Sequence, residues 1–329
     1  MNIKKIHICA LGGTIGSVAN SSADEYYDSA SINIESLISS LPINNEEIAL
    51  RSEQLFQKKS QDISYDDLLI TANKIHELVQ DDEVNGVVVT QGTNSIEEVA
   101  YFINLVINTK KPIVFTGSFR PNNSMDHDGS KNLYNAILLA ASNKAIGQGV
   151  LLTFNDSIVH AREASKINPS IMSDFSNSNL GVLGYIQGSN IHMHHQTLYK
   201  HTYLSAFNIV DIQKLPSVCI IYGHCGMSSI FVNAALKSNL KGIVSAGMGK
   251  GYQTIEVTES LVEASKQGVI IIRCSRSGQG IVHRDPKIDD KFGMVAGGSL
   301  NPQKAVILLA LALTKTDDKL EIQRFFDEY

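Results

Sequence analysis

The chain has 329 residues, of which 43% are hydrophobic and 19% are charged, and its formal net charge at pH 7 is −5. These values are typical of an ordinary soluble globular protein, and the length suits about two domains of roughly 150 residues each. Because the charge balance is slightly acidic, the composition argues against nucleic acid or an anionic membrane as a partner.

The N-terminus and the cysteines indicate where the protein is located. Residues 1–5 lead directly into an apolar run, and no long apolar segment with a small-residue cleavage site follows, so we expect no signal peptide. The longest apolar stretch, residues 305–313, is far shorter than the ~20 residues that span a bilayer. The four cysteines show no paired spacing, and Cys9, Cys219 and Cys274 lie in apolar runs. Buried free thiols and a cytoplasmic location are therefore expected.

Short runs rich in valine and isoleucine alternate with helical patterns along the chain. Because these runs are apolar on both faces, they predict buried strands of parallel sheets. The runs lie at residues 6–10, 86–90, 112–116, 149–154, 218–222, 242–246 and 269–273. Ser95, followed by two glutamates, predicts a capping box at a helix start, and Asn301 before Pro302 predicts another start. Gly268 is a predicted helix stop.

The regular alternation is lost between about residues 170 and 216, where polar clusters predominate. We predict an α/β protein in which a larger, doubly wound, mainly parallel domain spans residues 1–195. A connector at residues 196–216 then leads to a smaller α/β domain at residues 217–329.

Two glycine-threonine turns each follow an apolar strand. Thr14 ends the run Leu11-Gly12-Gly13-Thr14, and Thr93 follows Gly92 after the strand at residues 86–90. Glycine allows a tight turn that exposes a small hydroxyl residue beside free backbone N–H groups. Since sites in open parallel sheets form outside the carboxyl ends of the strands, both hydroxyls are predicted to share one crevice suited to acyl transfer. The alternative is that each threonine only caps a nearby helix.

A threonine nucleophile needs a base that removes its proton. Lys166 is one candidate, because it follows the strand at residues 149–154 and is placed at the same sheet edge. Burial would lower its pKa, whereas an exposed lysine would have no such role. Tyr26 and Tyr27 could supply a phenol near Thr14, or form an aromatic lid without a proton role.

Short motifs occur in a fixed order along the chain, and each is weak alone while the ordered set is highly specific. They are Gly12-Gly13-Thr14-Ile15, Ser60-Gln61-Asp62, Gly92-Thr93, Gly117-Ser118-Phe119-Arg120-Pro121, Asp128-Gly129, Asn132-Leu133-Tyr134-Asn135-Ala136, Asn155-Asp156 and Gly297-Gly298-Ser299-Leu300-Asn301-Pro302-Gln303-Lys304-Ala305. Through them the chain resembles the bacterial-type L-asparaginases of the asparaginase/glutaminase family, closest to the type II branch, over nearly its whole length.

The resemblance implies a double-displacement amide hydrolysis with L-asparagine as the default substrate. Thr14 would attack the side-chain carboxamide, and Tyr27 would shape the proton network of this nucleophile. Thr93 with Lys166 would activate a hydroxyl or water on the opposite side. The backbone N–H of Thr93 could stabilise the oxyanion, a contribution of about 3 kcal/mol to the barrier.

The resemblance also implies the substrate contacts and the assembly. Ser60 and Gln61 would hold the α-carboxylate of the substrate, with Thr93 and Asn94 beside them. Two subunits would complete each site within a homodimer or homotetramer, the smaller domain contributing to the neighbour's site. No cofactor and no metal are implied.

Three positions depart from the family pattern, all at the expected site of the substrate's α-ammonium. Asn94 stands where the family has an aspartate, Lys287 where type II enzymes have a glutamate, and Tyr252 where the partner subunit supplies an asparagine. One interpretation is drift with compensation by Asp285 or Asp289. The other is a different substrate, namely an amide whose α-amine is acylated or absent, or one with an extra carboxylate.

Other motifs leave alternatives open. His192 and His194 alternate and could be metal ligands on a strand, but an exposed connector is the preferred interpretation. The run of glycines at 247, 249 and 251 lacks nucleotide-binding spacing and predicts a structural turn near a subunit interface. His224 and Cys225 would form a thiol nucleophile only with a base nearby. A non-catalytic binding homologue is the remaining function class.

Overall fold

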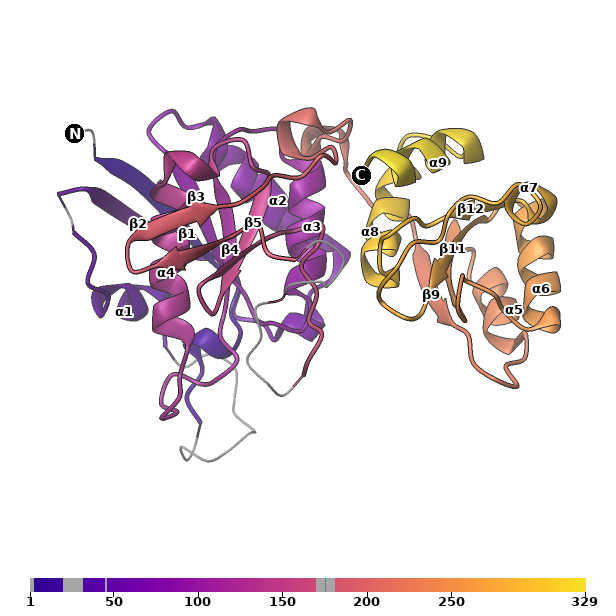
Figure 1. Ribbon diagram of the computed structural model, residues 1–329, viewed down its shortest axis with the longest axis horizontal. Helices are drawn as coiled ribbons and strands as arrows, with labels where there is room; N and C mark the ends of the chain where they lie inside the picture. The colour runs from indigo at the N-terminus through magenta and orange to yellow at the C-terminus, as the bar shows by residue number, and fades with distance from the viewer. Residues whose placement is uncertain (1–2, 20–31, 45, 170–174, 176–180) are drawn as a thin grey trace. The chain divides into compact units, whose positions relative to one another are not determined.

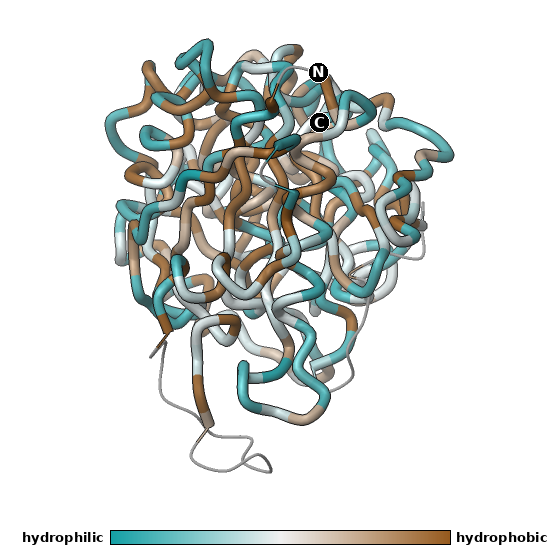
Figure 2. Tube along the Cα trace, turned by 90° about the vertical axis from the view of Figure 1, so that its left-hand side faces the viewer, coloured by the Kyte–Doolittle hydropathy of each residue, from teal (hydrophilic) through white to brown (hydrophobic). Residues whose placement is uncertain are grey.

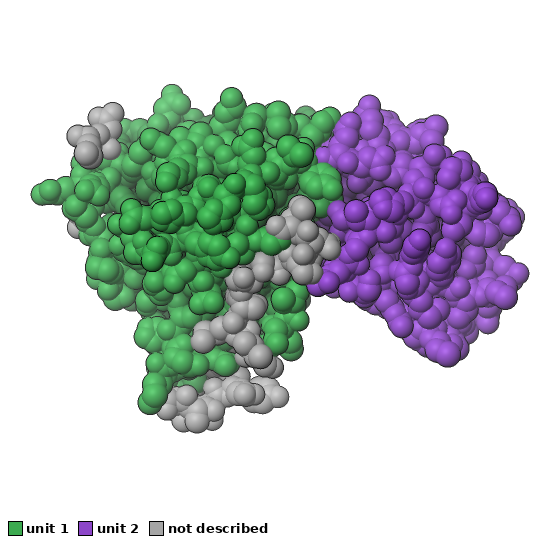
Figure 3. Space-filling view, in the orientation of Figure 1, with its two compact units in different colours: residues 1–211 green, residues 212–329 purple. Residues whose placement is uncertain are grey.

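The computed structural model describes residues 3–19, 32–44, 46–169, 175 and 181–329. The chain divides into two compact units, Met1–Asp211 and Ile212–Tyr329, which Figure 3 colours separately. The division falls inside the predicted connector at residues 196–216. Each unit is built on its own sheet, so the predicted α/β fold with a larger and a smaller domain is confirmed.

In unit 1 the described residues form an eight-stranded sheet with the order β2-β1-β3-β4-β5-β6-β7-β8. The first five strands in this order are parallel, and the pairs from β5 to β8 are antiparallel. The elements are β1 (Lys4–Ala10), α1 (Ile34–Ser39), β2 (Ile48–Gln54), α2 (Tyr65–Gln80), β3 (Gly86–Thr90), α3 (Ile96–Val106), β4 (Ile113–Thr116), α4 (Gly129–Ala141), β5 (Val150–Phe154), β6 (Ser157–His160), β7 (Gly184–Gln187) and β8 (Asn190–Met193).

The strands are buried because helices cover both faces of this sheet (Figure 1). Side chains of β1 such as Ile6 and Ile8 pack with Ile34 of α1 and Ile137 of α4 in one core cluster. Helices α2 and α3 pack against each other and against β3 and β5. Figure 2, which views the chain from the side of unit 1, shows the hydrophobic residues concentrated in the middle of the trace. This arrangement fits the predicted apolar runs.

Two local predictions for this unit were wrong. The segment expected to be irregular contains the hairpin β7–β8, in which Tyr185 pairs with His192. These strands escaped prediction because they are short and half exposed, with an alternating pattern. Ser95 precedes α3 but forms no capping bond, because its hydroxyl donates instead to the carbonyl of Ser60 at 2.5 Å.

The described residues of unit 2 form a four-stranded parallel sheet with the strand order β12-β11-β10-β9. Helices α5 and α6 pack together on one face, and α8 with α9 on the other. The predicted cap is confirmed, since Asn301 accepts a bond from the N–H of Lys304 at 2.9 Å. The elements are β9 (Val218–Tyr222), α5 (Ile230–Lys237), β10 (Gly242–Gly247), α6 (Ile255–Lys266), β11 (Ile270–Ser275), α7 (Asp289–Phe292), β12 (Met294–Ala296), α8 (Pro302–Ala312) and α9 (Lys319–Glu328).

Across the described ranges, none of the helices combines the length and the apolar character needed to traverse a bilayer.

Candidate active site

The two glycine-threonine turns lie in contact at one edge of the large sheet. They follow β1 and β3, which are neighbours, and the chain leaves β1 toward β2 on one side and later returns to β3 on the other. Such a switch in strand order opens a crevice at the carboxyl ends of the strands. A Cβ atom on Gly13 would lie only 2.2 Å from the backbone N of Gly92. Glycine at position 13, where φ is +92°, is therefore what lets the turns meet.

Thr14 opens a short 3-10 helix, η1 (Thr14–Gly16), directly after this contact. Its backbone carbonyl accepts a bond from the N–H of Ser17 at 3.0 Å, and its side chain is half-buried. Tyr26 and Tyr27, the phenols predicted to serve Thr14, lie outside the described residues. The structure thus places Thr14 at the shared edge of β1 and β3.

Lys166 reaches the second turn from a distant part of the chain. Its Nζ donates to Thr93 Oγ1 at 2.9 Å and to Asn94 Oδ1 at 2.8 Å. Its backbone N–H donates to Glu97 Oε2 at 2.7 Å, which fixes the main chain at this point. Glu97 was predicted only as part of a capping box, so its anchoring of Lys166 had no signal in the sequence.

Lys166 does not follow β5 directly, as the sequence predicted. The antiparallel strand β6 lies between β5 and Lys166 in the chain. The chain therefore first returns to the opposite edge of the sheet before Lys166 reaches Thr93. Burial lowers the pKa of Lys166, and the Glu97 carboxylate offsets part of that effect. The ring of Phe119 lies 5.7 Å from Nζ and contributes to this partly apolar surrounding. An amine with a lowered pKa loses its proton more readily and can act as a proton acceptor.

Asn94 is held by three neighbours. Its backbone N–H donates to Ser60 Oγ at 3.1 Å, and its Nδ2 donates to Gln61 Oε1 at 3.2 Å. Both partners stand on η2 (Ser60–Asp62), a 3-10 helix that follows β2. Ser60 and Thr93 are buried, whereas Gln61 and Asn94 are exposed. The predicted residues Ser60, Gln61, Thr93, Asn94 and Lys166 are thus one connected polar group.

A loop after β4 borders this group, and Asp128 holds its shape. The carboxylate of Asp128 accepts bonds from Ser118 Oγ at 2.6 Å, from the N–H of Phe119 at 3.0 Å and from the N–H of Arg120 at 3.1 Å. The ring of Phe119 is thereby fixed beside Lys166. The sequence marked these positions as motif residues without indicating what they do.

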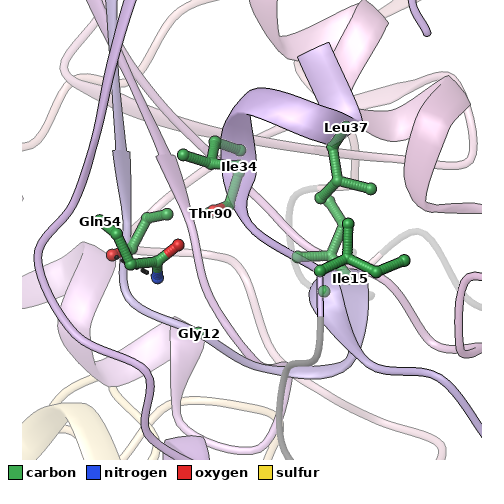
Figure 4. A pocket seen from close by; sticks show the side chains of 9 residues that line it. Gly12, Ile15, Ile34, Leu37, Gln54 and Thr90 are labelled. Atoms are coloured by element: carbon green, nitrogen blue, oxygen red, sulfur yellow. Dashed lines mark hydrogen bonds between the residues drawn. The ribbon is translucent and has the colours of Figure 1, made fainter. Parts of the chain in front are cut away.

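A small cavity lies behind the first turn (Figure 4). Its volume is about 10 Å³, and its walls are mainly apolar. The labelled lining residues include Gly12, Ile15, Ile34, Leu37, Gln54 and Thr90. Because the described residues of the predicted site do not line it, we assign this cavity to the packing behind the turn.

In unit 2, Tyr252 and Lys287 are both exposed. Tyr252 closes the glycine turn after β10 through two backbone bonds with Met248, of 2.7 and 2.9 Å. Asp289, one of the two carboxylates considered as compensation, is buried and forms bonds of 2.8 Å with Nε and Nη2 of Arg273. Asp285 accepts a bond from the N–H of Lys287 at 3.0 Å. Asp289 therefore stabilises unit 2 itself, and its charge is already neutralised.

Within the described parts of the chain, the remaining sequence candidates are not assembled into sites. His192 and His194 are exposed on and beside the edge strand β8, which corrects the preferred interpretation of a connector. The thiol of Cys225 is exposed, and Nδ1 of His224 faces the carbonyl of Cys225 at 2.9 Å. Among the described residues the ligand atoms of His7, Cys9 and Glu53 converge within 4.8 Å. Lys74 Nζ lies 3.3 Å from Glu53 in this cluster, so the lysine ammonium already supplies the positive charge that a metal ion would bring.

Known proteins match this chain over its full length. The family model "Asparaginase, N-terminal" matches residues 5–199, and "Glutaminase/Asparaginase C-terminal domain" matches residues 217–326. A "Probable L-asparaginase periplasmic" of Haemophilus influenzae is 37% identical over 329 residues, which are 100% of this chain and 94% of that protein. A "Glutaminase-asparaginase" of Pseudomonas fluorescens is 40% identical over 330 residues, covering 99% and 91% of the two chains.

A solved structure agrees with these matches. The probable cytoplasmic L-asparaginase from Campylobacter jejuni superposes with a TM-score of 0.95 at 35% identity, and the match covers 99% of this chain and 100% of that one. The two family models together cover most of both units. The chain therefore belongs to the asparaginase/glutaminase family.

Proposed function

We propose that the protein is an amidohydrolase that hydrolyses L-asparagine to L-aspartate and ammonia through Thr14. The observation that carries the proposal is the pair formed by Lys166 and Thr93, 2.9 Å apart, beside the turn that bears Thr14. The names of the relatives, L-asparaginase and glutaminase-asparaginase, support the same reaction class. Burial that lowers the pKa of Lys166 supports its use as a base.

In the proposed reaction Thr14 Oγ1 attacks the carboxamide carbon and its proton passes to a neighbouring base. The C–N bond then breaks, the proton goes to the leaving nitrogen, and ammonia departs from an acyl-enzyme ester. Water, deprotonated through Thr93 and Lys166, attacks the ester, and the carboxylic acid leaves while Thr14 regains its proton. We assign the shaping of the nucleophile's proton network to Tyr27.

Substrate binding is assigned to the polar group next to these residues. Ser60 and Gln61 are proposed to hold the carboxylate on the α-carbon, because both present hydrogen-bond donors at the crevice. The backbone N–H of Thr93 is proposed to stabilise the oxyanion, and losing such a donor costs about 3 kcal/mol in the barrier. The reaction so written uses no cofactor.

The experiment is ammonia release from L-asparagine by the purified full chain, with Thr14→Ala as the comparison. We expect turnover by the natural chain and a loss of at least about 10³-fold in Thr14→Ala. The melting temperatures of both proteins provide the control for folding. Calorimetric binding of L-asparagine without ammonia release by the folded natural chain would favour a non-catalytic binding homologue and overturn the proposal.

We further propose that two or four copies of the chain assemble. Apolar side chains gather near the carboxyl ends of β9 and β10 in unit 2, where Ile230 is 68% exposed, Phe231 63% and Tyr252 51%. Such exposure is unusual on a monomer and suits a second copy of the chain. Light scattering after gel filtration measures the mass, and Phe231→Asp is expected to lower it.

A cytoplasmic location is also our proposal. All four cysteines are free, which suits a reducing compartment, and the Campylobacter jejuni neighbour is called cytoplasmic. Fractionation of cells that express the native gene, with activity measured in each fraction, tests it.

A further inference from the structure

The orientation of the Asn94 amide is determined by its neighbours. The Lys166 amino group donates to the atom 2.8 Å away, so that atom must be the amide oxygen Oδ1. The amide nitrogen then faces Gln61, whose Oε1 accepts its bond at 3.2 Å. Reversing either amide would place two donors against each other. The chain of contacts starting at Lys166 therefore fixes which atoms face the crevice.

The polar groups left over in this arrangement are mainly donors. Asn94 keeps one N–H on Nδ2 and Gln61 keeps both N–H groups on Nε2, while the Gln61 oxygen, which accepts one bond, keeps one lone pair. Ser60 Oγ accepts from the N–H of Asn94 at 3.1 Å, which leaves its own hydrogen to donate. We call Ser60, Gln61, Asn94 and Lys166 the donor cluster. A donor cluster binds carboxylate and carbonyl oxygens, which only accept.

An ammonium group only donates, and the donor cluster offers it no carboxylate, only the leftover lone pairs of neutral amide oxygens such as Gln61 Oε1. The remaining lone pair of Asn94 Oδ1 could accept a bond, but Lys166 Nζ already lies 2.8 Å from that oxygen. While Lys166 is charged, it would repel a second cation at this position. Glu97 carries a negative charge behind Lys166, but its Oε2 accepts the backbone N–H of Lys166 and its side chain is buried, so it is not a binding partner for the ammonium group.

We propose that the preferred substrate is a small primary amide that carries a carboxylate but no cationic α-amine, so that the amine is acylated or absent. This proposal rests on the proposed amide hydrolysis and names its substrate class. The reaction is the same as in the proposed function, since water cleaves the C–N bond of the carboxamide and ammonia leaves. Asn94 is then a specificity-determining residue. It distinguishes a neutral from a charged substituent on the carbon that bears the carboxylate.

The test compares kcat/KM for three amides with the purified full chain, each followed by ammonia release. The probes are L-asparagine, N-acetyl-L-asparagine and succinamic acid, which lacks the amine. We expect the natural chain to prefer at least one of the last two over L-asparagine by about 10-fold or more. A preference of the natural chain for L-asparagine over both would overturn the proposal.

Asn94→Asp is the decisive variant. One carboxylate oxygen would keep the contact with Lys166, and the other would accept a bond from an ammonium group. We expect the ratio of kcat/KM values to shift toward L-asparagine by at least about 10-fold. Because all three probes use the same base, any effect of the variant on Lys166 cancels in this ratio. An unchanged ratio would overturn the proposal.

Asp62 supplies the matched control, because it is an exposed carboxylate on the same short helix as Ser60 and Gln61. We expect Asp62→Asn to leave the ratio unchanged. If it selectively reduced turnover of L-asparagine, an ammonium-binding carboxylate would exist at Asp62, and the proposal would be wrong. Absence of ammonia from all three probes would instead overturn the proposed function, and this inference with it.

Discussion

Lys166 Nζ lies 2.9 Å from Thr93 Oγ1, although 73 positions separate the two residues in the sequence. The contact joins the turn after β3 to a segment that the chain reaches only after β6. An amine that donates to a buried threonine hydroxyl in its charged form accepts that hydroxyl's proton in its neutral form. The protonation state of Lys166 should therefore govern the rate.

The first prediction concerns the pH dependence of kcat. Burial lowers the pKa of Lys166 below the usual value of about 10.4. Since the base works without its proton, kcat should rise with pH and level off above the lysine's pKa, at a lower pH than for an ordinary lysine. Lys166→Met should remove this rising limb and reduce kcat by about 10²–10⁴-fold. A Lys166→Met profile with the same limb would exclude Lys166 as the titrating group.

The second prediction is that Asn94→Asp moves the rising limb to higher pH. A carboxylate at this position would lie beside Nζ and favour the charged lysine, so the pKa of Lys166 would rise. The displacement is measured from kcat between pH 6 and 10 with the best substrate, and it should shrink at high salt. Asn94→Ala, which adds no charge, is the comparison. Equal profiles for the Asp and Ala variants would contradict the electrostatic explanation.

The third prediction tests the contact between the two turns. Gly13→Ala would force a Cβ to within 2.2 Å of the Gly92 backbone at a φ of +92°. We expect it to abolish activity and to cost several kcal/mol of stability, because backbone atoms on both sides must shift.

Gly188→Ala is the matched comparison for that variant. Gly188 has a φ of +62° in the turn between β7 and β8, and an added Cβ would meet nothing within 4 Å. It should cost only about 1 kcal/mol and preserve activity. Melting temperature and ammonia release measure both effects. Similar losses in the two variants would show that backbone conformation, and not the contact with Gly92, is limiting.

These contacts also show how far the sequence can predict the site. The strands are recognisable because apolar residues on both faces imply burial between two helical layers. The turns at Thr14 and Thr93 are recognisable because glycine follows a buried strand in both cases. Their meeting at one edge follows from the carboxyl ends of parallel strands.

Other features depend on contacts between distant segments and left no local signal. Ser95 fits a capping box, but its hydroxyl binds Ser60, 35 positions away. The sequence at Asn94 indicates a missing charge, yet only the contact with Lys166 determines which atom of the amide faces the crevice. Short strands toward the edge of the sheet, such as β7 and β8, bury little surface, so their apolar pattern is weak.

The last prediction compares two threonines that pair across β3 and β4, Thr90 and Thr116. Both are buried, but Thr116 Oγ1 donates to the carbonyl of Thr153 at 2.8 Å, whereas Thr90 Oγ1 has no hydrogen-bond partner among the described residues. Valine keeps the shape of threonine and removes the hydroxyl. Thr116→Val should lower the free energy of unfolding by about 1 kcal/mol, because a buried hydrogen bond is lost.

Thr90→Val should leave that free energy unchanged or raise it by up to about 1 kcal/mol, since no hydrogen bond is lost and a buried polar atom is removed. Thr90 also lines the cavity behind the first turn, where a methyl group meets mainly apolar walls (Figure 4). Urea unfolding followed by circular dichroism suits this chain, which has no tryptophan. A larger loss for Thr90→Val than for Thr116→Val would mean that the Thr90 hydroxyl has a hydrogen-bond partner in solution.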